Sequence, residues 1–127
     1  MATEFLDLIE NLHFEYPQFI TNLLKIGKTH QNRELMAFKL GDLDSNSRKS
    51  QVLLTSLHHS REPLSLTMNL QIFISKLHEL IHRTKRPDFF DTSELLFIPI
   101  VNLDSYTLIN QHYGKKDWEK FKRIRKN

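Results

Sequence analysis

The sequence predicts an α/β domain in which a partial mixed or parallel sheet carries flanking helices. Two short apolar segments, at residues 51–57 and 95–101, are typical of strands buried in a protein core. A long segment from Pro63 to His82 lies between them, and its apolar residues recur at helical spacing. Two buried strands joined by a helix are expected to run parallel in one sheet, through a right-handed crossover.

The N-terminal third of the chain predicts a helix followed by a β-hairpin. Apolar residues at helical spacing predict an amphipathic helix over residues 4–14 and one or two further helical turns over 17–24. Two extended segments then flank His30-Gln31-Asn32, whose residues favour a turn. We therefore expect a hairpin over residues 24–40 and a polar loop over 41–50.

The expected helix over 63–82 has one broad apolar face. That face is formed by Leu66, Leu70, Phe73, Ile74, Leu77, Leu80 and Ile81. Residues 83–91, which include Pro87, predict a loop before the second apolar strand. This strand leads directly into Asn102-Leu103-Asp104-Ser105-Tyr106.

Composition indicates one folded domain. The chain has 127 residues, of which 39% are hydrophobic and 26% charged, and no apolar run is long enough to cross a bilayer. There are no cysteines, and the acidic N-terminus does not predict a secretory signal. The net charge is only +3, although seven of the last thirteen residues are Lys or Arg. We expect neither a membrane nor a nucleic-acid partner.

The segment from Gln51 to Pro63 contains the candidate metal-binding and anion-binding residues. It places His59, Arg61 and Glu62 in a turn between a strand and a helix. An imidazole and a carboxylate three residues apart can face one metal ion, and this mixed donor set suits zinc, which in catalytic sites takes three protein ligands and a water. The arginine between them is an anion-binding group. The alternative is a turn histidine and a glutamate that interacts favourably with the helix dipole.

His59-Ser60-Arg61-Glu62, directly after a strand, matches the His-x-x-Glu signature of the zinc carboxypeptidases, the metallocarboxypeptidase family that includes carboxypeptidase A. Two further segments resemble this family in the same order along the chain. Asn102–Tyr106 is similar to its Val-Asn-Pro-Asp-Gly-Tyr segment, and residues 122–127 to its Arg-x-Trp-Arg-Lys-Asn segment. The resemblance covers residues 4–127 and implies the front part of a zinc-carboxypeptidase domain.

The resemblance also implies an activity, which is the Zn²⁺-dependent hydrolysis of C-terminal peptide bonds in peptides and proteins. In the family pattern, His59 and Glu62 bind the metal, and Arg61 and Arg125 bind substrate. Arg125 is also the catalytic arginine that stabilises the tetrahedral intermediate. Many relatives are secreted, so an extracellular location fits the family, but the sequence leaves the compartment open.

The family's third zinc ligand, its general-base glutamate and its carboxylate-binding residues are expected beyond residue 127. We therefore expect residues 1–127 to be a single incomplete peptidase domain, inactive on its own, with an exposed edge strand. The alternative is a non-catalytic peptide-binding module that kept the front half of the fold.

A second zinc motif lies inside the long helix. His78-Glu79-Leu80-Ile81-His82 matches the His-Glu-x-x-His pattern of zincin proteases. Helical geometry places both histidines beside Gln71 and Ser75 on the polar side, with Glu79 further round. Surface residues explain this pattern without a metal, so we do not expect a zincin active site.

Overall fold

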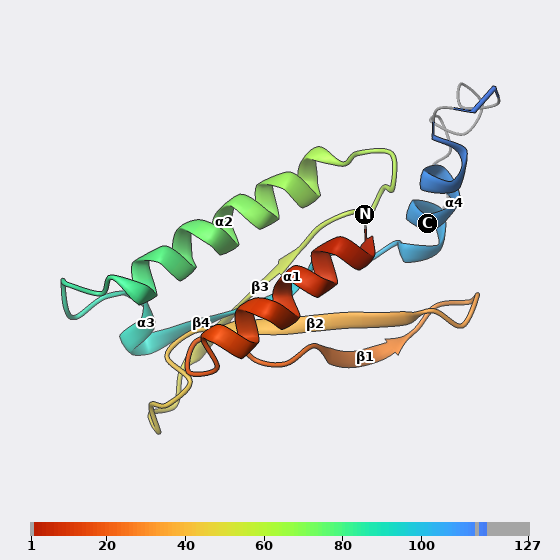
Figure 1. Cartoon of the computed structure of the whole chain (residues 1–127). Coiled ribbons are helices and arrows are strands. Elements are labelled where there is room, and N and C mark those ends of the chain that lie inside the picture. Colours follow the sequence, from red (N-terminus) through yellow and green to blue (C-terminus); the bar gives the residue numbers. More distant parts are fainter. Residues whose placement is uncertain (1, 114, 117–127) are drawn as a thin grey trace.

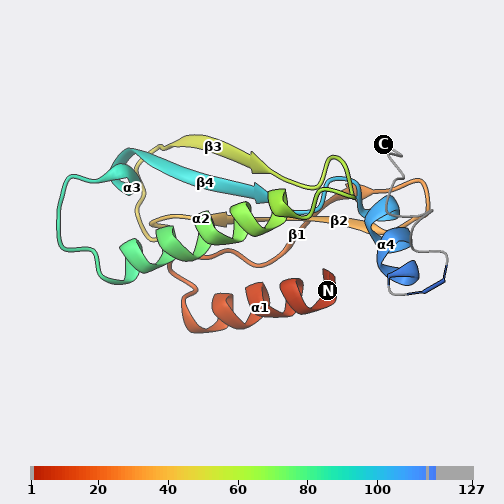
Figure 2. The ribbon, with the colours of Figure 1, turned by 90° about the horizontal axis from the view of Figure 1, so that it is seen from above.

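The computed structural model describes residues 2–113 and 115–116. Its centre is a four-stranded sheet in the order β1-β2-β4-β3, with α1 and α2 on the same face (Figures 1 and 2). The strands are β1 (Leu24–Lys28), β2 (Glu34–Leu40), β3 (Ser50–Thr55) and β4 (Ser93–Ile98). The helices are α1 (Ala2–Glu15), α2 (Leu64–Ile81), the short α3 (Phe89–Thr92) and α4 (Leu103–His112). None of the helices described is both long enough and apolar enough to cross a membrane.

The strand pairing confirms the predicted mixed sheet. β3 and β4 are parallel, with Val52 opposite Leu95, and α2 connects them. β1 and β2 form the predicted antiparallel hairpin, and β2 is antiparallel to β4, with Phe38 opposite Phe97. As a result, the hairpin turn lies at the carboxyl ends of β3 and β4, whereas residues 41–49 lie at their amino ends (Figure 1).

Three aromatic rings form the centre of the core between the sheet and α2. Phe38 of β2 stacks on Phe97 of β4, with ring centroids 5.0 Å apart. Phe73 of α2 packs edge-on against both rings, at centroid distances of 5.1 and 5.7 Å. α1 covers the same face and adds the buried Ile9. These contacts fix α2, and therefore the turn that precedes it, against the sheet.

The prediction that the strand before this turn is buried is wrong. β3 ends at Thr55 and lies at the edge of the described sheet, and the side chains of Val52 and Leu53 are 41% and 56% exposed. A run of apolar residues indicates that a strand can be buried, but it does not show whether another strand or helix covers it. β4, which has a neighbour on each side, is the buried strand, with Leu95 and Phe97 in the core.

Other boundaries also differ from the predictions. The expected helical turns over 17–24 reduce to one turn, closed by the Ile20 N–H and the Tyr16 carbonyl at 3.0 Å. Ile20 then pairs with Leu40, because burial beside β2 outweighs the local helical pattern. The expected loop 83–91 ends early, since Asp88 caps α3.

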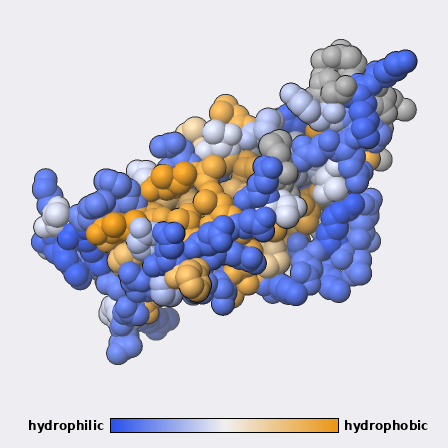
Figure 3. All heavy atoms as spheres, in the orientation of Figure 1, coloured by the Kyte–Doolittle hydropathy of each residue, from blue (hydrophilic) through white to orange (hydrophobic). Residues whose placement is uncertain are grey.

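The buried face of α2 is narrower than its apolar pattern predicts. Ile74 and Ile81 are exposed, whereas the polar Asn69 is buried. Apolar surface gathers between α1 and α2 (Figure 3). Asn69 is accommodated because its side-chain amide donates a hydrogen bond to the hydroxyl of Ser56 at 2.9 Å.

An ion-pair cluster closes the amino ends of β3 and β4. The largely buried side chain of Arg83 contacts Asp42, Asp88 and Asp91 at 2.8, 2.7 and 2.9 Å. The hydrogen bond to Asp88 raises the pKa of Arg83 and lowers the pKa of Asp88. The cluster therefore joins the end of α2, the loop before β3 and the helix before β4.

Candidate functional site

The candidate zinc ligands lie in the turn that joins β3 to α2. After Thr55 the chain leaves the strand, and Leu57 takes a positive φ of 53° while its side chain is buried. The backbone of the turn is tied to the end of β4, since the N–H groups of Val101 and Asn102 donate to the carbonyls of Ser56 and Leu57 at 3.1 and 2.9 Å. The start of the turn is thus held in a conformation that is unfavourable for leucine.

Two serines in this turn have buried hydroxyl groups in different environments. Ser56 is 1% exposed, donates a hydrogen bond to the Pro99 carbonyl and accepts one from Asn69. Ser60 is 2% exposed, and its hydroxyl has no hydrogen-bond partner among the described residues. A buried hydroxyl without a partner is uncommon, so Ser60 marks a departure from ordinary packing beside the candidate ligands.

His59 and Glu62 lie at the two ends of one tight turn. The Glu62 N–H donates to the His59 carbonyl at 3.0 Å, and α2 begins two residues later. The Ser65 hydroxyl fixes this geometry by accepting from the Leu57 N–H and donating to the Glu62 carbonyl, both at 3.0 Å. Arg61, which lies between them, is exposed.

The donor set fits zinc, but only in part. His59, which is half-buried, and Glu62, which is exposed, place an imidazole and a carboxylate in one turn, and both are donor groups that suit zinc. Over residues 2–113 and 115–116, no group of three or more His, Asp or Glu side chains is arranged to hold a metal ion. A catalytic zinc takes three protein ligands, and the described residues bring no such set together.

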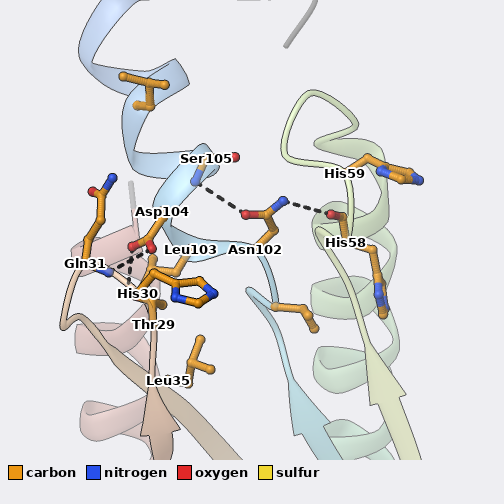
Figure 4. Close-up of a pocket in the computed structure, with 12 residues that line it drawn as sticks. Thr29, His30, Gln31, Leu35, His58, His59, Asn102, Leu103, Asp104 and Ser105 are labelled. Carbon is orange, nitrogen blue, oxygen red and sulfur yellow. Dashed lines mark hydrogen bonds between the residues drawn. The ribbon is translucent and has the colours of Figure 1, made fainter. Parts of the chain in front are cut away.

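Asn102 connects this turn to α4. Its side-chain oxygen accepts from the Ser105 N–H at 3.4 Å, which caps the helix, and its amide donates to the His58 carbonyl at 3.2 Å (Figure 4). A small apolar cluster nearby is formed by Leu57, Ile100 and Tyr106. The residue that caps α4 thus also holds the backbone next to His59.

Asp104 connects α4 to the β1–β2 hairpin. Its carboxylate accepts hydrogen bonds from the Thr29 hydroxyl at 2.7 Å and the Gln31 N–H at 3.2 Å (Figure 4). It also accepts one from the Arg33 guanidinium at 2.8 Å. Burial alone raises the pKa of Asp104, but the hydrogen bonds from Thr29 and Arg33 outweigh it and keep the pKa below its ordinary value. The carboxylate therefore stays charged and fixes the hairpin turn.

These contacts surround an open cavity of about 630 Å³ at the carboxyl ends of β3 and β4. The hairpin turn lines one side and residues 101–105 line another, while His58 and His59 lie at its rim. The ring of His59 points away from Asp104 (Figure 4), and the Nε2 of His58 lies 2.8 Å from the Thr55 hydroxyl.

The structure places three of the four predicted site residues in one turn: His59, Arg61 and Glu62. Arg125, the predicted catalytic arginine, lies outside the described residues. Sequence reasoning missed the linking roles of Asn102 and Asp104. Asn102 had a recognisable signal, since asparagine before a helix is a favoured N-cap. Asp104 had none, because its partners lie more than seventy residues earlier in the chain.

Comparison with known proteins decides the family. The family model for zinc carboxypeptidases matches residues 5–127. The chain belongs to the zinc carboxypeptidase family. A zinc carboxypeptidase of Saccharothrix mutabilis subsp. capreolus is 31% identical over 93 residues, which cover 71% of this chain and 21% of the relative. The inactive metallocarboxypeptidase ECM14 of Saccharomyces cerevisiae is 27% identical over 109 residues, which cover 84% of this chain and 24% of that protein.

Solved structures confirm the fold. Thrombin activatable fibrinolysis inhibitor superposes with a TM-score of 0.76 at 21% identity, over 98% of this chain and 29% of that one. Carboxypeptidase A from Helicoverpa armigera superposes with a TM-score of 0.67 at 22% identity, over 94% of this chain and 26% of that one. The chain spans about a fifth to a quarter of the length of its curated relatives.

Proposed function

We propose that this chain supplies two of the three zinc ligands of a metallocarboxypeptidase that hydrolyses C-terminal peptide bonds. The observation that carries the proposal is the turn that joins β3 to α2. It presents His59 and Glu62 three residues apart, and hydrogen bonds to Ser65 and to the end of β4 hold its backbone. Membership of the zinc carboxypeptidase family supports the choice of metal.

Each proposed residue has one role. His59 donates a ring nitrogen and Glu62 a carboxylate oxygen to Zn²⁺, which when bound polarises the scissile carbonyl and lowers the pKa of a water. The exposed Arg61 binds a carbonyl or carboxylate of the peptide substrate. Arg125 binds the substrate carbonyl and stabilises the negative charge that develops on its oxygen.

Two ligands make the isolated chain a poor enzyme. A catalytic zinc site uses three protein ligands, of which this proposal assigns two, and no group of three or more metal-binding side chains is found among the described residues. We expect the purified 127-residue chain to release no C-terminal residues from a peptide with added zinc, as measured by mass spectrometry of the products. Release that depends on zinc and is abolished by His59→Gln would show that the chain contains a complete site.

One relative favours a second candidate function. The yeast protein that matches 84% of this chain is named an inactive metallocarboxypeptidase. A non-catalytic module of this fold would bind peptide C-termini through its arginines alone. Binding of a peptide with a free C-terminus, measured by fluorescence anisotropy with and without a chelator, separates the two functions. Binding that survives the chelator and is lost with an amidated peptide supports the module, whereas zinc-dependent binding supports the metal site.

A further inference from the structure

The last turn of α2 presents two histidine rings side by side. The ring centroids of His78 and His82 are 4.5 Å apart, and the ring planes are inclined by 47°. The His82 N–H donates to the His78 carbonyl at 3.1 Å, so the backbone fixes their separation at one helical turn. Both side chains are exposed, as the helical pattern predicts. Exposed rings can rotate so that a nitrogen of each faces the same point.

The position on the helix favours a cation. The last carbonyl groups of a helix lack intrahelical partners and form the negative end of its dipole. The neighbouring Glu79 carboxylate is engaged by the Lys76 ammonium, at 2.9 and 3.1 Å. The protein therefore presents two imidazoles rather than a histidine pair with a free glutamate base. Water would complete the coordination of an ion bound there.

We propose that His78 and His82 form a bidentate surface site for a divalent transition-metal ion. Imidazole suits Zn²⁺, Ni²⁺ and Cu²⁺, and the usual order of affinity makes Cu²⁺ the tightest of the three. The site uses neither His59 nor Glu62, so it does not depend on the proposed peptidase function. A bound ion joins the two ends of the last helical turn and resists its fraying. Because the Glu79 carboxylate is engaged by Lys76, we assign the site a role in binding and not in hydrolysis.

Titration of the 127-residue chain with NiCl₂ tests this proposal, by calorimetry for affinity and by NMR for histidine ring signals. The variants are His78→Gln and His82→Gln, and the matched control is His30→Gln, which removes an exposed histidine from the hairpin turn. We expect each of the first two substitutions to weaken binding by at least about tenfold, because each removes one of two protein ligands. The control should bind nickel as the unmodified chain does.

Thermal unfolding without metal separates a lost ligand from a damaged fold. All three variants should unfold at the same temperature, since each side chain is exposed. Added nickel should stabilise the unmodified chain and the control more than it stabilises His78→Gln or His82→Gln. Unchanged nickel affinity in either His78→Gln or His82→Gln would overturn the bidentate site, and so would an equal loss in Glu79→Gln.

Discussion

At the amino ends of β3 and β4, Arg83 forms ion pairs with three carboxylates, whereas at their carboxyl ends Asn102 and Asp104 hold the backbone through hydrogen bonds. The first end joins charged side chains to one another. At the second end, Asn102 bonds to the turn that carries the candidate ligands, and Asp104 bonds to the hairpin turn. The ion pairs at the first end therefore fix helices and loops, whereas the hydrogen bonds at the second end fix the candidate site.

The second end also carries features that stability alone does not explain. Leu57 has a positive φ of 53°, and the buried Ser60 hydroxyl has no partner within the described residues. Strained backbone and unsatisfied polar groups persist where the surrounding structure holds them, and they concentrate at functional sites. At the first end, the charged groups of Arg83 and its three partners are paired. At the second end, stabilising hydrogen bonds therefore occur together with one strained residue and one buried hydroxyl group that has no partner among the described residues.

The largest expected effect comes from breaking the charge cluster at the first end. Arg83→Met removes the shared cation and leaves three carboxylates close together, so we expect a loss of about 3 kcal/mol in the free energy of unfolding. Urea denaturation measures this loss. The control Lys76→Met breaks only the exposed pair with Glu79 and should cost less than about 0.5 kcal/mol. Equal effects of the two substitutions would contradict a special role for this cluster.

Acid should also weaken the Arg83 cluster. The resulting loss in the free energy of unfolding should be no larger than the loss caused by Arg83→Met. The hydrogen bond from Arg83 lowers the pKa of Asp88 below its ordinary value of 3.8. A backbone hydrogen bond from Asp88 and the Arg86 side chain lower the pKa of Asp91. Because these pKa values are lower in the folded chain than in the unfolded chain, their stabilisation is present above 3.8 and is lost as the pH falls through the folded values.

Urea denaturation between about pH 5 and pH 2 checks this sign. The unmodified chain should lose stability as the pH falls. Arg83→Met should lose less over the same interval, since Asp88 no longer has the guanidinium that lowers its pKa. Parallel pH profiles for the two chains would show that the acid sensitivity arises elsewhere.

The two buried serines at the second end give the next effect. Ser56→Ala removes the hydroxyl that accepts from the Asn69 amide and donates to the Pro99 carbonyl. We expect the free energy of unfolding to fall by about 1–3 kcal/mol. Ser60→Ala removes a hydroxyl with no partner in the described part, and should change the free energy of unfolding by less than about 0.5 kcal/mol or increase it. Similar losses in the two variants would show that Ser60 is stabilised like Ser56.

A smaller effect is expected at the hairpin. Asp104→Asn keeps the shape of the side chain but removes the charge that binds Arg33, so we expect a loss of about 1–2 kcal/mol. Hydrogen exchange of the hairpin amides should also increase. The control Glu34→Gln breaks the exposed pair with Lys25 in the same hairpin and should cost less than about 0.5 kcal/mol. An unchanged exchange rate in Asp104→Asn would show that Asp104 does not hold the hairpin.

The sequence predicts those parts of the fold that depend on local pattern. The hairpin, α2 and the parallel pair of β3 and β4 follow from residue spacing, and the His59–Glu62 turn follows from a short motif. The exposure of β3 could not be predicted, because it depends on which strands lie beside it. The pair of Ser56 and Asn69 and the contacts of Asp104 form between distant residues, and no local pattern encodes them.

The proposal that His59 and Glu62 are zinc ligands is tested most directly by a zinc titration followed through histidine ring NMR signals. The chain should carry His78→Gln and His82→Gln, so that the helix pair does not compete for the ion. We expect zinc to shift the His59 ring signals with weak affinity, since the proposal gives the ion only two protein ligands. We expect Glu62→Gln to weaken that response by at least about tenfold. Signals of His59 that do not respond to zinc, or that respond equally in Glu62→Gln, would contradict the proposal.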